Sequence, residues 1–185
     1  MLPKNADILT PEICTLADGS VITIRPIHPD DADDLQNTFM RLSTQSIYLR
    51  FLSYKKVLTD EEALRLATVD YNTQMAFVAT MVENGREIVV GVSRYALLDK
   101  VHPKTAESAV IVGDEFQGRG IGKLLLWKLV NYARAKGFDH LRGNLDMGNT
   151  RMLDLIKRSG LPHRQRYEDG VWQVNIDIRL PHKDD

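Results

Sequence analysis

The sequence contains very little cysteine and no long apolar run, and both shortages narrow what the protein can be. Cys14 is the only cysteine, so an internal disulfide is excluded. The histidines are not spaced as metal ligands, and we expect no metal. No apolar stretch is long enough to span a membrane, and "MLPKNADILT" lacks the apolar core of a signal peptide. We therefore expect a cytoplasmic protein with no membrane partner.

Charge is nearly balanced over the whole chain but not along it. The formal net charge is −1, yet residues 117–170 carry eleven Lys and Arg against five Asp and Glu. This basic segment would suit a polyanionic ligand, and the acidic remainder of the chain would suit a cationic substrate. The alternative is that both segments simply form ordinary solvated surfaces. No basic tract has interleaved aromatic residues, so we expect no nucleic-acid partner.

The length and a hydrophobic content of 43% suit one globular domain over residues 1–185, with 1–18 and 181–185 expected as flexible ends. Alternating apolar residues predict a strand over 20–27. Helical spacing and start signals predict helices over 28–43, 43–53 and 59–69, the last opened by a capping box of Thr59 and Glu62.

The remaining chain reads as strands and helices in alternation. Asn84-Gly85 predicts a hairpin within 75–98, because both residues tolerate positive φ, and 105–112 adds a third strand. A helix ending near Lys136, a strand over 138–145, a helix over 149–160 and a hairpin around Asp169-Gly170 follow. This order predicts a mixed sheet with helices on its faces.

A glycine-rich turn joins the strand over 105–112 to the next helix. Backbone amides left free at a helix start form an anion site, and a phosphate is the natural ligand. The turn is not a Walker A loop, because Gln117 and Leu124 occupy its first glycine and hydroxyl positions. Gly118, Gly120 and Gly122 also differ from the dinucleotide fingerprint, and the observed pattern is Gln-x-x-Gly-x-Gly. A turn that merely connects strand and helix is the alternative.

This segment resembles the coenzyme A pyrophosphate loop of the GNAT superfamily of acyl-CoA-dependent N-acyltransferases. Asn149, which opens the helix after the next strand, and Gly160-Leu161, which closes it, are also similar to that family. The stretches "TIRPIHPDDADDL", "LSTQSIYLRF" and "AESAVIVGDEFQGRGIG" resemble the acetyltransferase domain of bacterial Pat-type protein lysine acetyltransferases. The resemblance implies an α/β (α+β) GNAT fold, with a mixed, mostly antiparallel central sheet flanked by helices on both faces.

The resemblance also implies acetyl-CoA as cosubstrate. Amides between Gly118 and Lys123 are expected to point at its pyrophosphate, with Arg119 and Lys123 adding positive charge. The residues expected to bind the coenzyme are Val110, Ile111, Val112, Gln117, Gly118, Arg119, Gly120, Ile121, Gly122, Lys123, Asn149 and Met152.

Transfer of an acyl group to an amine requires the neutral amine. A lysine with a pKa of about 10.4 must lose its proton at pH 7, which costs roughly 4–5 kcal/mol, so a general base helps. Glu107 is the expected base, because it lies ten residues before Gln117, where similar enzymes place their catalytic glutamate. An outward-facing or ion-paired strand residue is the alternative reading, and Asp114 and Glu115 are alternative bases.

Many relatives protonate the departing thiolate with a tyrosine seven residues after Asn149, and this chain has Ile156 there. The thiolate then leaves without an acid, or Tyr48 or Tyr167 supplies the proton. Arg50 has two readings, as a binder of an acidic group on a protein substrate or as a helix-surface ion pair.

The expected function is an acetyl-CoA-dependent N-acetyltransferase that acts on a protein lysine by direct transfer in a ternary complex. Acetylation of a small amine, an amino acid or a protein N-terminus is the first alternative. A non-catalytic acyl-CoA-binding regulator is the second. Residues 28–58 and the closing hairpin are expected to line the acceptor site.

Overall fold

A central sheet organises the protein. The computed structural model describes residues 8–98, 102 and 104–179. In this part of the chain the sheet has eight strands in the order β1-β2-β3-β4-β5-β6-β8-β7, and only β5 and β6 pair in parallel. The expected mixed, mostly antiparallel sheet is confirmed. The strands are β1 (Glu12–Thr15), β2 (Val21–Pro26), β3 (Gln74–Glu83), β4 (Arg86–Leu97), β5 (Thr105–Val112), β6 (His140–Leu145), β7 (His163–Glu168) and β8 (Val171–Asp177).

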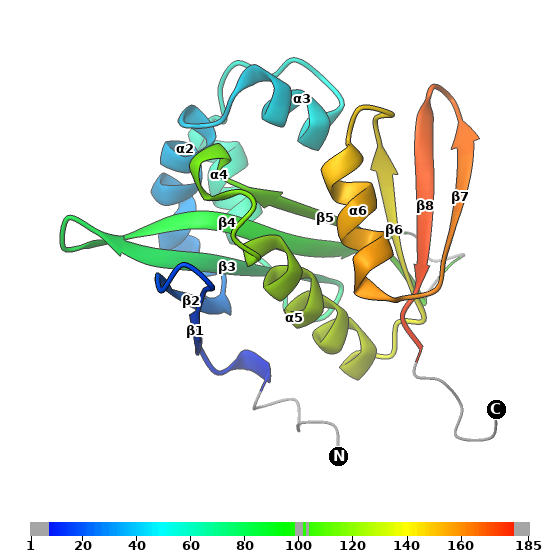
Figure 1. Cartoon of the computed structure of the whole chain (residues 1–185), viewed down its shortest axis with the longest axis horizontal. Coiled ribbons are helices and arrows are strands. Elements are labelled where there is room, and N and C mark those ends of the chain that lie inside the picture. Colours follow the sequence, from blue (N-terminus) through cyan, green and yellow to red (C-terminus); the bar gives the residue numbers. More distant parts are fainter. Residues whose placement is uncertain (1–7, 99–101, 103, 180–185) are drawn as a thin grey trace.

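Helices cover both faces of this sheet (Figure 1). One face packs against α2 (Ala32–Met40), α3 (Thr44–Phe51) and α4 (Asp60–Ala67), and the other against α5 (Ile121–Ala135) and α6 (Thr150–Ser159). Short 3₁₀ turns, η1 (Pro29–Asp31) and η2 (Asp114–Phe116), precede α2 and the glycine-rich loop. No described helix is long and apolar enough to cross a membrane.

Two hydrophobic cores lie on opposite faces of the sheet. The main core, beneath α5 and α6, includes Phe77, Leu125 and Leu129, each fully buried. The second core, beneath α2 to α4, includes Val78 and Ala63. Alternate residues of a strand therefore serve different cores, as the two-residue period of a strand requires.

The turns and helix caps that were predicted from local sequence signals are present in the structure. Asn84 and Gly85 both have positive φ, 52° and 77°, at the turn between β3 and β4. Thr59 and Glu62 form the capping box of α4. Gly160 ends α6 with a φ of 72°, a left-handed conformation that glycine adopts without strain.

The strand β1 was not expected. Its residues Glu12 to Thr15 pair with β2, within the segment 1–18 that was expected as a flexible end. Leu16 is also buried, so this part of the segment belongs to the folded domain. Four residues are too few for an alternation signal, which explains why periodicity missed this strand. Residues 1–7 and 180–185 lie outside the described residues.

A buried carboxylate joins β2 to the start of the α2 region. Asp31 is 5% exposed and accepts hydrogen bonds from Arg25 at 2.7 and 2.8 Å and from the backbone N–H of His28 at 2.7 Å. Burial alone would raise the pKa of Asp31, but these hydrogen bonds outweigh burial and hold its pKa below the usual value. Charged Asp31 therefore stabilises the fold.

We predict that Asp31→Asn lowers the free energy of unfolding by about 3 kcal/mol at pH 7, because it leaves Arg25 without its buried partner. Since the folded pKa lies below the unfolded one, this stabilisation is present above pH of about 4 and is lost as the pH falls further. Urea denaturation at pH 7 and pH 3 should show the gap between the variant and the wild type narrowing. Asp30→Asn is the control, because that side chain is 90% exposed. A gap that does not change with pH would contradict the assignment.

Candidate active site

The parallel strands β5 and β6 separate in the middle of the sheet. They pair from Thr105 with His140 to Glu107 with Arg142, and no pairing follows. Nevertheless β5 runs on to Val112 beside β4, while β6 runs on to Leu145 beside β8. The sheet therefore opens beyond Glu107 and Arg142.

One edge of this opening carries backbone groups of β5 that have no strand partner. The N–H of Gly113 donates to the carbonyl of Val90 on β4 at 2.9 Å. In an antiparallel pair such bonds recur at every second residue, so the groups of Ile111 also face β4, whereas those of Val110 and Val112 face the opening. The opening can thus bind an extended ligand that has amide groups. Ile111, an expected coenzyme residue, instead packs its side chain against the second core.

The glycine-rich loop and the start of α5 lie at the end of β5. Gly118 and Gly120 have φ values of 79° and 92°, which only glycine adopts readily. Gly120 begins α5, and no side chain caps this helix. A Cβ on Gly122 would lie 3.7 Å from Val112 and 3.6 Å from Leu155, so the first turn of α5 sits between β5 and α6. Uncapped amides at this place form an anion site next to the opening.

Gln117 holds this loop in place through its side chain. Its amide nitrogen donates to the carbonyl of Val112 at 2.9 Å, and its amide oxygen accepts a hydrogen bond from Arg151 on α6. The residue therefore connects the loop to both walls of the opening. Gln117 therefore contributes to the expected coenzyme site by holding the loop in place, because its side chain already forms hydrogen bonds with the protein on both sides.

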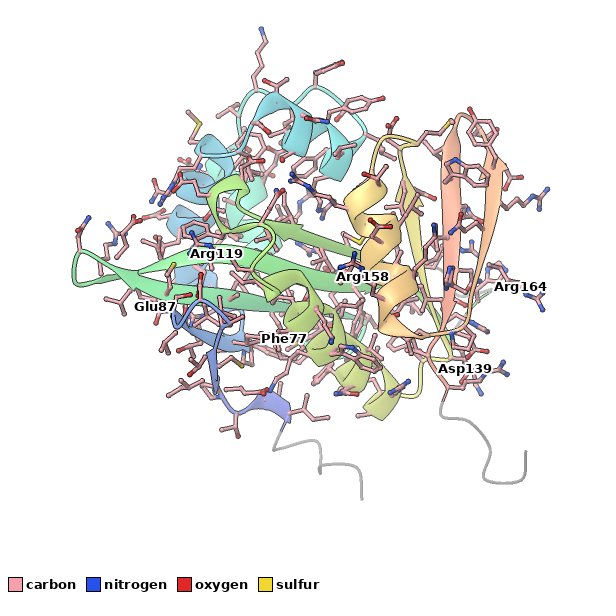
Figure 2. The ribbon with its side chains drawn as sticks, viewed as in Figure 1. Phe77, Glu87, Arg119, Asp139, Arg158 and Arg164 are labelled. Atoms are coloured by element: carbon pink, nitrogen blue, oxygen red, sulfur yellow. The ribbon has the colours of Figure 1, made fainter. Side chains whose placement is uncertain are left out.

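The other loop residues contribute in different ways. Arg119, which is labelled in Figure 2, donates to the carbonyl of Glu115 at 3.1 Å and lies 3.5 Å from Asp18, so protein groups hold part of its charge. Ile121 is 1% exposed and can offer a ligand only its backbone. Lys123 is exposed at the start of α5. Lys123 is therefore the cation of this loop best placed to approach a phosphate.

The start of α6 forms the other side of the opening. Asn149 caps this helix, its side-chain oxygen accepting from the N–H of Met152 at 3.1 Å. Met152 packs against the main core. Ile156 is 4% exposed in the same core, so this position supplies no acid. Asn149 and Met152 thus lie beside the opening. The isoleucine that replaces the usual tyrosine packs in the hydrophobic core.

The two candidate tyrosines have aromatic neighbours. Tyr48, on α3, stacks on Tyr54 with ring centroids 5.0 Å apart. Tyr167 is 54% exposed on β7 and packs against Trp172, with ring centroids 5.5 Å apart. In the described part of the chain, neither hydroxyl forms a hydrogen bond with Glu107, and a role for either as the acid stays a prediction.

Glu107 lies at the point where the sheet opens. Its neighbour Ala106 is buried in the main core, so the Glu107 side chain projects from the opposite face, where it is exposed. Arg142 on β6 is directly opposite in the register. Arg50 of α3 is close enough for its charge to interact with Glu107. The carboxylate is thus accessible from the face that carries α3.

Two arginines near this carboxylate are partly removed from water. Burial lowers the pKa of Arg50, and the nearby Glu107 opposes this shift. Burial, together with the positive charges of Arg50 and Arg65, lowers the pKa of Arg94 to about 10. Neither Arg94 nor Arg142 was predicted from the sequence to belong to the site. Arg94 does interrupt the apolar run of β4, which was the available signal.

The alternative bases have structural partners. Asp114 accepts from the Ser43 N–H at 2.7 Å and from the Ser46 hydroxyl at 2.6 Å, and so attaches the start of α3 to the loop. Burial raises the pKa of Asp114, but these hydrogen bonds outweigh it and hold the pKa below its usual value. Glu115 pairs with Arg41 at 3.0 Å. Both alternative bases are therefore held by hydrogen bonds or an ion pair within the protein.

Comparison with known proteins identifies the family. Residues 42–161 match the acetyltransferase (GNAT) family, and the chain belongs to it. It is 33% identical to an acetyltransferase of Pseudomonas aeruginosa over 87% of this chain and 86% of that protein. It is 30% identical to the acetyltransferase Pat of Mycolicibacterium smegmatis over 94% of this chain but only 50% of that protein, so it spans about half of Pat.

The fold agrees with this family. The GNAT domain of S. lividans PAT superposes with a TM-score of 0.81 at 25% identity, covering 90% of this chain and 96% of that domain. The expected GNAT fold is therefore confirmed, and the chain is an enzyme of the GNAT acetyltransferase family.

We predict that acetyl-CoA raises the melting temperature, because a ligand of the native state alone stabilises it by mass action. Gly120→Ala should abolish this rise by placing a strained residue and a methyl group at the loop. Gly137→Ala is the matched control, because Gly137 has a φ of 85°, ends the same helix, and also faces open space. Both variants should lose similar stability, about 1 kcal/mol, through left-handed strain. An equal rise in melting temperature for the two variants with acetyl-CoA would contradict the placement of the coenzyme site at this loop.

Proposed function

We propose that the protein transfers an acetyl group from acetyl-CoA to the ε-amine of a protein lysine, with Glu107 as general base. The observation that carries this proposal is the position of Glu107, an exposed carboxylate at the point where β5 and β6 separate. The anion site at the start of α5 lies at the far end of the same strand. Donor and acceptor can therefore meet at one carboxylate.

The backbone arranges the donor. Amides at the start of α5 and the Lys123 ammonium bind the pyrophosphate, as helix N-termini commonly do. The backbone groups of Val110 and the N–H of Val112 bind the amides of the pantetheine arm in the opening. From Val112 to Glu107 the strand spans about 17 Å, a distance comparable to the extended arm. The thioester then lies beside Glu107.

Glu107 prepares the acceptor. Its carboxylate takes one proton from the lysine ammonium, directly or through water, and the neutral amine attacks the thioester carbonyl. The C–N bond forms, the C–S bond breaks, and the sulfur leaves with the electron pair as coenzyme A thiolate. The nitrogen of the new amide releases its second proton to solvent. Because Ile156 occupies the usual tyrosine position, the thiolate leaves without a proton from that residue.

The proposal that the acceptor is a protein lysine rests on the similarity of this chain to the Pat enzymes. The Pat enzymes named above are relatives over most of this chain, and the stretches that resemble them include α3, beside Glu107. Incubation of the protein with labelled acetyl-CoA and a cell extract, followed by mass spectrometry of the labelled products, tests this class. Label on lysines of a few proteins would support the proposal, and label confined to small amines or N-termini would contradict it.

We predict that Glu107→Gln lowers turnover by about 10²- to 10⁴-fold, the usual contribution of positioned proton transfer. Raising the pH should partly restore activity, because more of the acceptor amine is then already neutral. The measurement is the pH–rate profile with one identified acceptor at saturating acetyl-CoA. The coenzyme-induced melting shift should not change, since the amide is nearly isosteric and the anion site is elsewhere.

Glu115→Gln is the matched control, because it removes the carboxylate of an alternative base that pairs with Arg41. It should retain nearly full turnover. Equal rates for wild type and Glu107→Gln at neutral pH would show that Glu107 is not the base. Binding of acetyl-CoA without turnover on any amine would favour the regulator alternative.

A further inference from the structure

A row of polar side chains extends from Glu107 across the last strands of the sheet. The registers place Glu107, Arg142, Asn175 and Arg164 opposite one another on β5, β6, β8 and β7. Residues opposed in this way project from the same face of a sheet. Arg166 lies two residues beyond Arg164 and shares that face. Three arginines thus follow Glu107 on one surface.

This surface is not covered by the helices that cover the rest of the face. Leu141 and Ile176, neighbours of the row, belong to the main core beneath α5 and α6, so the row points to the other side. There the second core contains residues of α2 to α4 and of β3 to β5, and none from the described parts of β6, β7 or β8. Figure 1 shows α6 in front of β6, and Figure 2 shows Arg164 extending outward from β7. A partner can therefore reach the row.

Two further arginines border Glu107 from the covered side of this face. Arg50 approaches from α3, and Arg94 lies on β4, two residues from Ala96, the β4 residue opposite Glu107. We call Arg50, Arg94, Arg142, Arg164 and Arg166 the arginine face.

Positive charge on the arginine face exceeds the negative charge available to it. Among the described residues, only Arg166 of the five has a carboxylate within ion-pair distance, Glu168 at 3.5 Å. Asp177, also on this side of β8, pairs with Arg179 at 2.5 Å. The Nε of Arg142 and the Oδ1 of Asn175 are buried without a hydrogen-bond partner in the described part of the chain.

We propose that the arginine face binds an acidic segment of the acceptor protein, so that the preferred acceptor lysine is flanked by Asp or Glu. This inference rests on the proposed function and names the substrate class for the same site. Guanidinium groups bind carboxylates through paired hydrogen bonds, and they steer an acidic segment to the site.

The arrangement also suits the chemistry. An acidic residue next to a lysine favours the charged ammonium, which cannot attack a thioester. Arginines that pair with those acidic residues remove this effect when the lysine reaches Glu107. The same face can therefore select an acidic segment and leave its lysine able to lose a proton.

Three peptides test the proposal. Each has a blocked N-terminus and one lysine, flanked on both sides by Asp, by Asn or by Arg. At saturating acetyl-CoA, kcat/KM should be at least about ten-fold higher for the Asp peptide than for the Asn peptide, mainly through KM, and lowest for the Arg peptide. The preference should shrink at high salt, which screens exposed charges.

Two matched double variants show which arginines cause the preference for the Asp peptide. The double variant Arg164→Gln and Arg166→Gln should lower the preference for the Asp peptide by about five-fold or more, with turnover on the Asn peptide unchanged. Arg158→Gln and Lys157→Gln remove the same charge from the last turn of α6, on the other face, and should leave the preference unchanged (Figure 2). An unchanged melting shift with acetyl-CoA confirms that each variant is folded.

The outcomes separate the two proposals. Equal kcat/KM for the three peptides would overturn the acidic-segment proposal and leave lysine acetylation standing. Acetylation of free amino acids or small amines, but of none of the peptides, would overturn both. Peptide affinity, measured by fluorescence anisotropy with coenzyme A present, gives a readout that is independent of turnover. Equal affinities of the three peptides would again overturn the acidic-segment proposal.

Discussion

The separation of β5 from β6 after Glu107 and Arg142 is the feature on which the candidate site depends. Each strand remains anchored on its other side, β5 by β4 and β6 by β8, so the sheet can open without coming apart. The opening leaves backbone groups of β5 without a strand partner, and such groups bind a ligand that has amides of its own. The same separation places the Glu107 carboxylate at the inner end of the opening and the first turn of α5 at its outer end.

The two substrate sides of this opening are connected through the loop that precedes α5. Gln117 joins the loop to β5 and α6, on the side expected to hold the coenzyme. Asp114 joins the same loop to the start of α3, the helix that carries Arg50 toward Glu107. The side chains of Gln117 and Asp114 therefore attach the loop to both sides of the opening.

Local signals predicted most of the elements, and distant pairing explains most of what they missed. Apolar periodicity and turn residues such as Asn84-Gly85 located the strands and helices, and the Gln-x-x-Gly-x-Gly pattern located the anion site. The position of Arg142 beside Glu107 depends on the register of two strands that are separated in sequence by the whole of α5. The pairing of β5 with β4, which turns the backbone groups of Ile111 away from the opening, likewise depends on strands that have no local signal for their register. Side-chain partners such as Asp18 for Arg119 have no local signal at all.

A crystal structure with an analogue in which coenzyme A is joined covalently to a lysine-containing peptide is the most direct test of this opening as the active site. We expect the pyrophosphate to contact amides at the start of α5, the arm to lie between β5 and β6, and the lysine nitrogen to lie within one hydrogen bond or one water of Glu107. A lysine that enters from the side of α5 and α6, with its nitrogen away from Glu107, would show that the acceptor does not meet the thioester at Glu107.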